Sequence, residues 1–191
     1  MNNYFVILAA GKSKRFDKNI NKLFYSYKNK YIIDHSVEKS LDSKLFKKII
    51  IVTNNLNYFK KKKYPKQIKV IKGGKERSDS SLIALKYLKK FKPKNVFIHD
   101  AARPNFSIKL LQNIAKNLKN NKAVVPVISS KDSIKYKFKN QIFNLNRNNS
   151  FLTQTPQAFR FKDLYNFAIK EKNKITDEAT LFINKNRKIK F

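Results

Sequence analysis

The sequence predicts an α/β protein whose central sheet is mostly parallel and is flanked by helices. Short apolar runs rich in Ile and Val recur along the chain, and stretches with helical periodicity separate them. Glycine or charged residues follow the ends of several runs, as expected where buried strands turn toward solvent. Because strands and helices alternate, the strands are expected to be parallel, with helices on both faces of the sheet.

The individual elements follow from the same periodicities. Apolar runs predict strands at residues 5–8, 48–53, 68–71, 95–100 and 123–128. Helical spacing predicts helices over 34–41, from residue 80 onward, over 108–118 and over 163–170, and the lysine run 60–63 is expected on another helix. Residues 176–179 have the pattern of a helix start, and 188–191 that of the beginning of a strand.

Residues 129–149 differ from the rest, because polar and aromatic residues alternate there around a turn near Lys139 and Asn140. This predicts an exposed β-hairpin, which is unstable alone and is expected to pair with another subunit. The 191 residues, 41% of them apolar, otherwise suit one core. We therefore expect a single domain over 1–191 with a protruding β-arm at about 129–150.

Composition excludes several classes of protein. The chain has no Cys, which rules out disulfides and thiolate sites and agrees with a reducing cytosol. The N-terminus enters a predicted strand without a signal-peptide pattern, and no apolar run approaches the length of a membrane span. We expect a cytoplasmic protein that does not bind membranes.

The net charge of +32 is the strongest argument for a nucleic-acid partner. However, the excess is nearly all Lys scattered along the chain, and only residues 60–63 form a run. Such a bias arises from genome composition without selection for binding. We expect no nucleic acid as partner, and a basic RNA-binding module stays open as an alternative of a different class.

In so lysine-rich a chain, the few arginines and glycines are informative. Arginine offers a planar bidentate fork that lysine cannot replace. Four arginines fall in turns or loops: Arg15, Arg77, Arg103 and Arg147. All three glycines follow predicted strands: Gly11, Gly73 and Gly74.

The first of these corners predicts a polyphosphate site. Gly11 lets backbone N–H groups approach a phosphate, and Arg15 and Lys22 supply positive charge. The Gly73–Gly74 pair precedes a helix start that includes Ser80, which suits an anion or a base edge. An ordinary glycine turn and simple helix capping are the structural alternatives.

A lone carboxylate predicts the metal. Asp100 ends a predicted strand at the edge where the cations gather, and Mg²⁺ prefers one or two carboxylates plus phosphate oxygens. Arg103 is expected to orient Asp100 or to contact substrate; a surface Asp–Arg pair is the alternative. His99 is expected to be structural.

Five blocks together carry a resemblance to a known family. They are residues 8–15 with Lys22, 73–80, 99–104, 154–157 and 176–179, which read LAAGKSKR, GGKERSDS, HDAARP, QTPQ and TDEA. In their order and spacing, over nearly the whole chain, they resemble 2-C-methyl-D-erythritol 4-phosphate cytidylyltransferases. The resemblance implies a Rossmann-like nucleotidyltransferase that joins CTP and methylerythritol phosphate, with Mg²⁺ as cofactor, in non-mevalonate isoprenoid synthesis.

The resemblance also implies the site residues and a homodimer. Arg15 and Lys22 are the catalytic pair, and Asp100 holds the metal. The CTP pocket includes Ala9, Ala10, Gly11, Gly74, Ser80 and Ala101. The polyol phosphate is bound by Arg103, Thr155, Thr176 and Arg147, the last from the arm of a partner subunit. In-line displacement needs fixed positive charge and positioning rather than a protein nucleophile, which agrees with these residue types.

Three departures from the family pattern accompany the resemblance. Ser13 replaces a second glycine, and the segment 127–132 is longer than usual. Family members also continue with a strand that carries a further Asp and Lys, so we expect a truncated C-terminal end. A cytidylyltransferase for another polyol phosphate, such as ribitol 5-phosphate, is the closest alternative.

Overall fold

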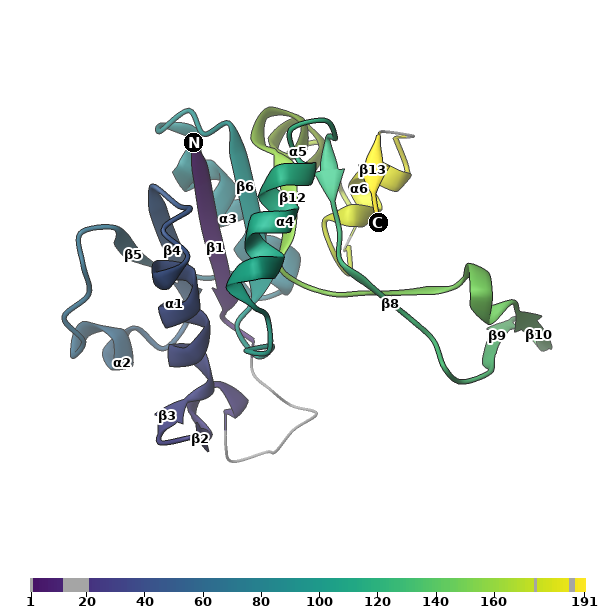
Figure 1. Cartoon of the computed structure of the whole chain (residues 1–191), viewed down its shortest axis with the longest axis horizontal. Coiled ribbons are helices and arrows are strands. Elements are labelled where there is room, and N and C mark those ends of the chain that lie inside the picture. Colours follow the sequence, from purple (N-terminus) through teal and green to yellow (C-terminus); the bar gives the residue numbers. More distant parts are fainter. Residues whose placement is uncertain (1, 12–20, 174, 186–187) are drawn as a thin grey trace.

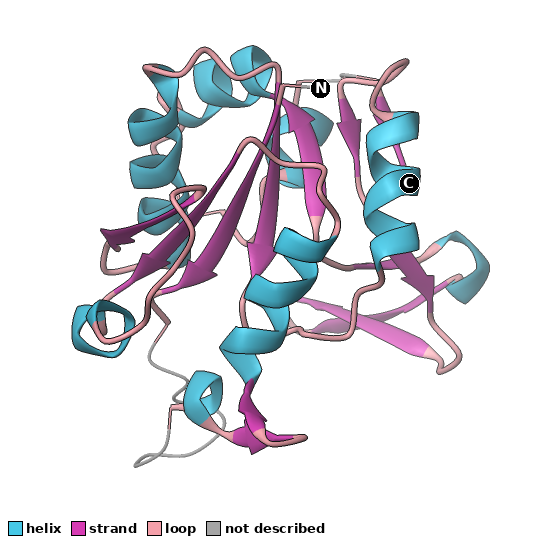
Figure 2. Ribbon diagram, turned by 60° about the vertical axis from the view of Figure 1, so that its left-hand side comes forward, coloured by secondary structure: helices cyan, strands magenta, loops and turns pink. Residues whose placement is uncertain are grey.

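A computed structural model of the chain shows a seven-stranded sheet with helices on both faces (Figure 1, Figure 2). The structure describes residues 2–11, 21–173, 175–185 and 188–191. The strand order is β13-β7-β12-β6-β1-β4-β5. These strands are β1 (Asn3–Ala9), β4 (Lys48–Thr53), β5 (Ile68–Lys72), β6 (Asn95–Asp100), β7 (Ala123–Val124), β12 (Gln157–Arg160) and β13 (Ile189–Lys190).

The mostly parallel sheet predicted from the sequence is confirmed. β1 is parallel to β4 and β6, and β4 is parallel to β5. β12 is the exception, because it runs antiparallel to β6 and β7 on its two sides. The order places β1 in the interior of the sheet, between β6 and β4, and all seven of its residues are buried.

Alternation along β1 separates two apolar layers. Phe5 and Ile7 belong to the layer that packs against α1, α2 and α4, whereas Val6 and Leu8 belong to the layer under α3, α5 and α6. The helices are α1 (Ile32–Asp42), α2 (Leu56–Lys60), α3 (Arg77–Lys89), α4 (Ile108–Asn117), α5 (Phe161–Ala168) and α6 (Ala179–Ile183). None of the helices in the described ranges has the length and apolar character needed to cross a membrane.

The predicted arm projects from the body (Figure 1). β9 (Ile134–Phe138) and β10 (Gln141–Leu145) form the hairpin, with the turn at Lys139 and Asn140 as predicted. β8 (Val127–Ser129) pairs with β11 (Phe151–Thr153) at the base, and the 3-10 helix η2 (Arg147–Asn149) lies between the hairpin and β11.

Three predicted elements needed correction. The strand expected over 123–128 is two strands, because the chain passes from β7 to β8 at Val125 and Pro126 and changes sheets. The lysine run 60–63 lies mostly beyond the end of α2 at Lys60. The third helix begins at Arg77 rather than near residue 80.

The early start of α3 has a local cause. Glu76 and Asp79 form a reciprocal capping box, in which each side chain accepts from the other residue's backbone N–H. Acidic residues, and not the serines, therefore cap this helix. A short ladder of β2 (Ser26–Tyr27) and β3 (Lys30–Tyr31) and the 3-10 helix η1 (Lys22–Phe24) complete the described elements.

Candidate functional site

The site lies at the carboxyl edge of the parallel strands, where the first glycine corner and Asp100 come together. Leu8 of β1 pairs with Asp100 of β6, and the Ala101 N–H donates to the Leu8 carbonyl oxygen at 3.1 Å. Gly11 follows β1 at this same edge. The two segments that the sequence singled out for phosphate and metal are therefore neighbours.

The loops that follow β1, β4 and β5 are joined directly. The Asn54 side-chain amide donates to the carbonyl oxygens of Ala10 and Gly74, at 3.3 Å each, and the Gly73 N–H donates to the Thr53 carbonyl oxygen. A Cβ at Gly73 would lie 2.4 Å from that of Ala10, so only glycine allows this approach. Asn54 has no counterpart among the predicted site residues; its place directly after a buried strand was the available signal.

Ser80 acts on the glycine pair through a bridging hydroxyl. Its Oγ accepts from the Gly74 N–H and donates to the Glu76 carbonyl oxygen, both at 3.1 Å. The side chain is buried inside α3. A Cβ at Gly74 would approach the Cβ of Asp79 to 2.3 Å. The loop before α3 is thus held tightly against the helix that follows it.

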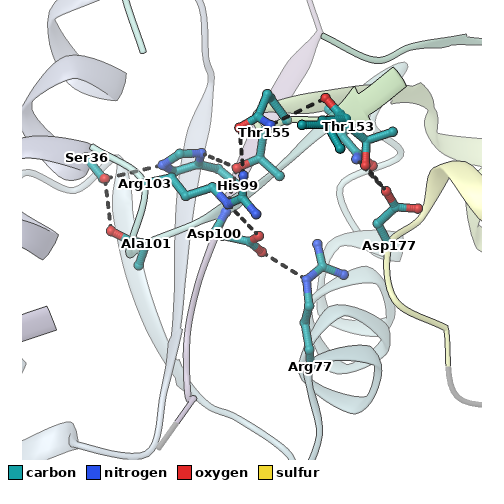
Figure 3. A network of polar contacts seen from close by, with 12 residues as sticks. Ser36, Arg77, His99, Asp100, Ala101, Arg103, Thr153, Thr155 and Asp177 are labelled. Carbon is teal, nitrogen blue, oxygen red and sulfur yellow. Dashed lines mark hydrogen bonds and ion pairs between the residues drawn. The ribbon is translucent and has the colours of Figure 1, made fainter. Parts of the chain in front are cut away.

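Arg77 joins two carboxylates from different elements. Its Nη1 and Nη2 donate to the two oxygens of Glu178 at 3.0 Å each. Its Nε donates to Asp100 Oδ1 at 2.9 Å, the contact drawn in Figure 3. The Glu178 side chain is only 1% exposed. Burial lowers the pKa of Arg77, but the negative charges of Glu178 and Asp100 raise it by more than burial lowers it. The net shift is upward, so the guanidinium stays charged.

These contacts add two residues to the predicted site. Arg77 was recognised as a scarce arginine in a loop but had no assigned role, and Glu178 appeared only as part of a helix start. The signal that could have found Arg77 is its arginine identity, because the three-way contact needs the guanidinium fork. The Glu178 contact is long-range and has no local sequence signal.

Asp100 keeps capacity for a further ligand. Its side chain is 28% exposed, and its second oxygen, Oδ2, lies 3.6 Å from Arg103 Nε, beyond hydrogen-bond distance. Arg103 donates instead to the Gln154 side-chain oxygen at 2.7 Å. Within the described ranges, no group of three or more acidic or His side chains gathers to hold a metal. The single partly open carboxylate nevertheless suits Mg²⁺, which takes most of its ligands from phosphate and water.

His99 is buried beneath this edge, as the sequence predicted for a structural residue. Its ring lies against Phe106, with the centroids 4.6 Å apart, and its two nitrogens contact Ser36 and Thr155. Burial lowers the pKa of His99 to about 3, helped by the positive charges of Arg103 and Lys39. The imidazole is therefore neutral at physiological pH.

A cluster of polar side chains around Asp177 joins β11, where the arm meets the body, to α6. Asp177 Oδ2 accepts from Thr153 and from the Gln157 amide at 3.0 Å each, and Oδ1 accepts from the Thr180 N–H. Burial raises the pKa of Asp177, but these hydrogen bonds outweigh it and the net shift is downward. The helix start predicted at 176–179 is present, and Thr176 itself is exposed beside this cluster.

Not every predicted residue meets at this edge. Arg147 lies on η2 in the arm, exposed, where it donates to the Lys131 carbonyl oxygen. Lys22 opens η1, and Arg15 lies outside the described residues. Ala101 is fully buried, and its backbone makes hydrogen bonds to the Leu8 carbonyl oxygen and the Ser36 hydroxyl. Ala9, Ala10, Gly11, Gly74, Ser80, Asp100, Arg103 and Thr155 share the edge.

The chain matches known proteins over nearly its whole length. Residues 4–189 match the family model described as IspD: 2-C-methyl-D-erythritol 4-phosphate cytidylyltransferase. The chain is 45% identical, over all 191 residues, to the bifunctional enzyme IspD/IspF of Pelagibacter ubique. It spans 52% of that relative's length. It is 34% identical to the 2-C-methyl-D-erythritol 4-phosphate cytidylyltransferase of Thermosipho africanus, with 96% of this chain and 85% of the relative covered.

A solved structure agrees with the fold. The crystal structure of 4-diphosphocytidyl-2C-methyl-D-erythritol synthase from Anaerococcus prevotii superimposes with a TM-score of 0.86 at 28% identity. The match covers 98% of this chain and 86% of that one. The Rossmann-like fold implied by the five sequence blocks is confirmed.

Proposed function

The chain belongs to the 2-C-methyl-D-erythritol 4-phosphate cytidylyltransferase family, and on that premise we propose its reaction and the roles of its residues. The reaction transfers a cytidylyl group from CTP to 2-C-methyl-D-erythritol 4-phosphate. It gives 4-diphosphocytidyl-2-C-methyl-D-erythritol and pyrophosphate for non-mevalonate isoprenoid synthesis. The meeting of the glycine loops with Asp100 at one sheet edge is the observation that carries this proposal.

The chemistry is an in-line displacement at the α-phosphorus of CTP. An ionised phosphate oxygen of the polyol phosphate forms the new P–O bond, and the bond from the α-phosphorus to the departing pyrophosphate breaks. The attacking oxygen carries no proton at neutral pH, so no general base is required. The protein's task is to place both phosphates and to offset the charge that develops between them.

In our proposal the loops after β1, β5 and β6 form the CTP pocket. Their close approach at Gly73, and the Asn54 bridge, give a rigid backbone surface for the nucleotide. Arg15 and Lys22 supply positive charge to the triphosphate. The CTP pocket comprises Ala9, Ala10, Gly11, Gly74, Ser80 and Ala101.

Mg²⁺ is the proposed cofactor, and Asp100 is the residue that would hold it. The bound ion supplies charge neutralisation for the triphosphate oxygens. Arg77 keeps Asp100 oriented through Oδ1, whereas Oδ2 has only the longer, 3.6 Å ion pair with Arg103. Arg103, Thr155 and Thr176 form the proposed site for the polyol phosphate.

We propose that Arg147 completes this site from the arm of a second copy of the chain. The arm carries many exposed apolar side chains, among them Ile142, which is 70% exposed, and Phe138, Phe143 and Leu145. A lone hairpin with such a surface is expected to be covered. The homodimer therefore brings together residues that the single chain leaves apart.

Pyrophosphate release tests the reaction and its substrate. The protein is assayed with CTP and Mg²⁺, and with either methylerythritol phosphate or ribitol 5-phosphate. We expect turnover with methylerythritol phosphate; turnover with ribitol 5-phosphate alone would contradict the proposal. Tight RNA binding that weakens with salt, without affinity for CTP, would instead favour a nucleic-acid-binding protein.

Two substitutions test the assigned roles. Asp100→Asn should raise the Mg²⁺ concentration needed for half-maximal turnover, because an amide is a weaker ligand than a carboxylate. Arg15→Lys should reduce turnover by about 100-fold while leaving the fold intact, because the bidentate contact is lost. An unchanged Mg²⁺ titration, or unchanged turnover, would remove the respective residue from the mechanism.

A further inference from the structure

A chain of hydrogen bonds runs through the buried ring of His99 and ties three segments of the site together (Figure 3). The Asp100 N–H donates to Thr155 Oγ1 at 3.2 Å, and Thr155 Oγ1 lies 3.1 Å from His99 Nδ1. On the other side, His99 Nε2 lies 3.3 Å from Ser36 Oγ, which donates to the Ala101 carbonyl oxygen at 3.3 Å. The chain thus begins and ends on adjacent backbone groups at the end of β6.

The hydrogen atoms that these hydrogen bonds share can be counted. A carbonyl oxygen only accepts, so the contact with Ala101 uses the single hydroxyl hydrogen of Ser36. The contact between Ser36 and His99 then needs a hydrogen on Nε2. A neutral imidazole with Nε2–H has a bare Nδ1, which must accept. Thr155 therefore donates its hydroxyl hydrogen to His99 and accepts from the Asp100 N–H.

The other neutral form of the ring satisfies fewer groups, and the charged form is disfavoured by burial. With the hydrogen on Nδ1, Ser36 has to donate to Nε2, and the bond from Ser36 to Ala101 is lost. A doubly protonated ring could make the same four contacts, but it would bury a positive charge completely, with only hydroxyl groups at its two nitrogens. Of the two neutral forms, only Nε2–H makes all four contacts.

We propose that His99, in its Nε2–H form, is a positioning residue that locks Thr155 and the Asp100–Ala101 backbone in place. This deepens the proposed function and rests on it, because Thr155 and Asp100 are site residues there. Thr155 directs its hydroxyl hydrogen inward to His99, so it has none to offer a phosphate oxygen. Within the proposed polyol phosphate site, Thr155 serves by holding the backbone that carries Asp100, and Arg103 supplies the positive charge.

NMR of the intact protein labelled with ¹⁵N-histidine tests the tautomer without any assay of turnover. The chain has only two histidines, His35 and His99, and substitution of His35 by Gln assigns the spectrum. At pH 7 we expect His99 to show a protonated Nε2 and an unprotonated Nδ1. A protonated Nδ1, alone or in the imidazolium, would overturn the proposal whatever reaction the protein catalyses.

Variants then separate positioning from mere packing. Thr155→Val keeps the side-chain shape but removes the hydroxyl, and should shift the His99 Nδ1 resonance and lower kcat about tenfold or more. Thr155→Ser should restore both. Ser36→Ala should shift the Nε2 resonance, whereas Ser40→Ala, which loses only a bond to Val37 within α1, should leave both resonances and kcat unchanged. A Thr155→Val protein with unaltered Nδ1 signal or unaltered kcat would refute the proposal.

Discussion

His99 illustrates how burial determines the chemistry of a single side chain. An imidazole at the protein surface has a pKa near 6.5, close to physiological pH. Here Phe5 and Phe106 enclose the ring, and its two nitrogens meet hydroxyls rather than charges. The ring is thereby kept neutral and serves as a two-sided hydrogen-bonding spacer beneath Asp100.

This environment predicts a pH-dependent stability. The unfolded chain binds a proton at His99 below pH 6.5, whereas the folded chain does so only near pH 3. Stability from this group is complete above pH 6.5 and is lost as the pH falls toward 3, by up to about 1.4 kcal/mol per pH unit. Urea unfolding at pH 7 and pH 5 measures the loss.

The matched variant for this experiment is His99→Phe, whose ring can pack between Phe5 and Phe106 but cannot titrate. The difference in unfolding free energy between wild type and His99→Phe should shrink from pH 7 to pH 5. A difference that stays constant over this interval would show that His99 is protonated equally in the folded and unfolded chains.

Among the elements, α3, α6 and the end of β6 are joined by one guanidinium. Arg77 begins α3, Glu178 is the residue before α6, and Asp100 ends β6. The Glu178 carboxylate is buried, so its charge is compensated chiefly by Arg77. The position of two helices relative to the site edge therefore depends on this contact.

Glu178→Gln is expected to destabilise the fold by about 3 kcal/mol, because it leaves a mostly buried guanidinium with one carboxylate fewer. Asp163→Asn breaks an exposed ion pair with Lys122 and should cost less than about 1 kcal/mol. Chemical denaturation of both variants measures the contrast. Equal losses for the two would mean that the Arg77 contact contributes no more than a surface pair.

At the scale of the whole molecule, the arm is the part that the single chain leaves uncovered. Its hairpin strands have exposed apolar side chains on both β9 and β10. The body, by contrast, buries both faces of its sheet beneath helices (Figure 2). The proposed assembly through the arm would cover these side chains and bring Arg147 to a site in the partner.

Ile142→Lys should therefore shift the protein from dimer to monomer, because a charge replaces the most exposed large apolar side chain of the arm. Ile183→Lys, at a 56% exposed position on α6, is the matched control and should stay dimeric. Light scattering coupled to size-exclusion chromatography gives the mass. A monomeric wild type, or a dimer unaffected by Ile142→Lys, would contradict assembly through the arm.

Local patterns predicted most of the elements and the edge of the site. The strands at 48–53 and 95–100 have the predicted bounds, because short apolar runs rich in β-branched residues with polar ends are typical of buried strands. Errors occurred at the boundaries of elements. Pro126 lies where the chain leaves one sheet for another, and Glu76 and Asp79 cap α3 through each other rather than through the serines.

What the sequence alone determined was the fold class, the family and the edge where Gly11 and Asp100 lie, since the alternation of strands and helices is encoded in local hydrophobic periodicity and the family in short motifs. What only the tertiary structure decided was how side chains at that edge share their hydrogens and charges. Arg77 and Glu178 are 101 residues apart in the sequence, and Thr155 and His99 are 56 apart. Such contacts depend on the packing of distant segments, which no local pattern encodes.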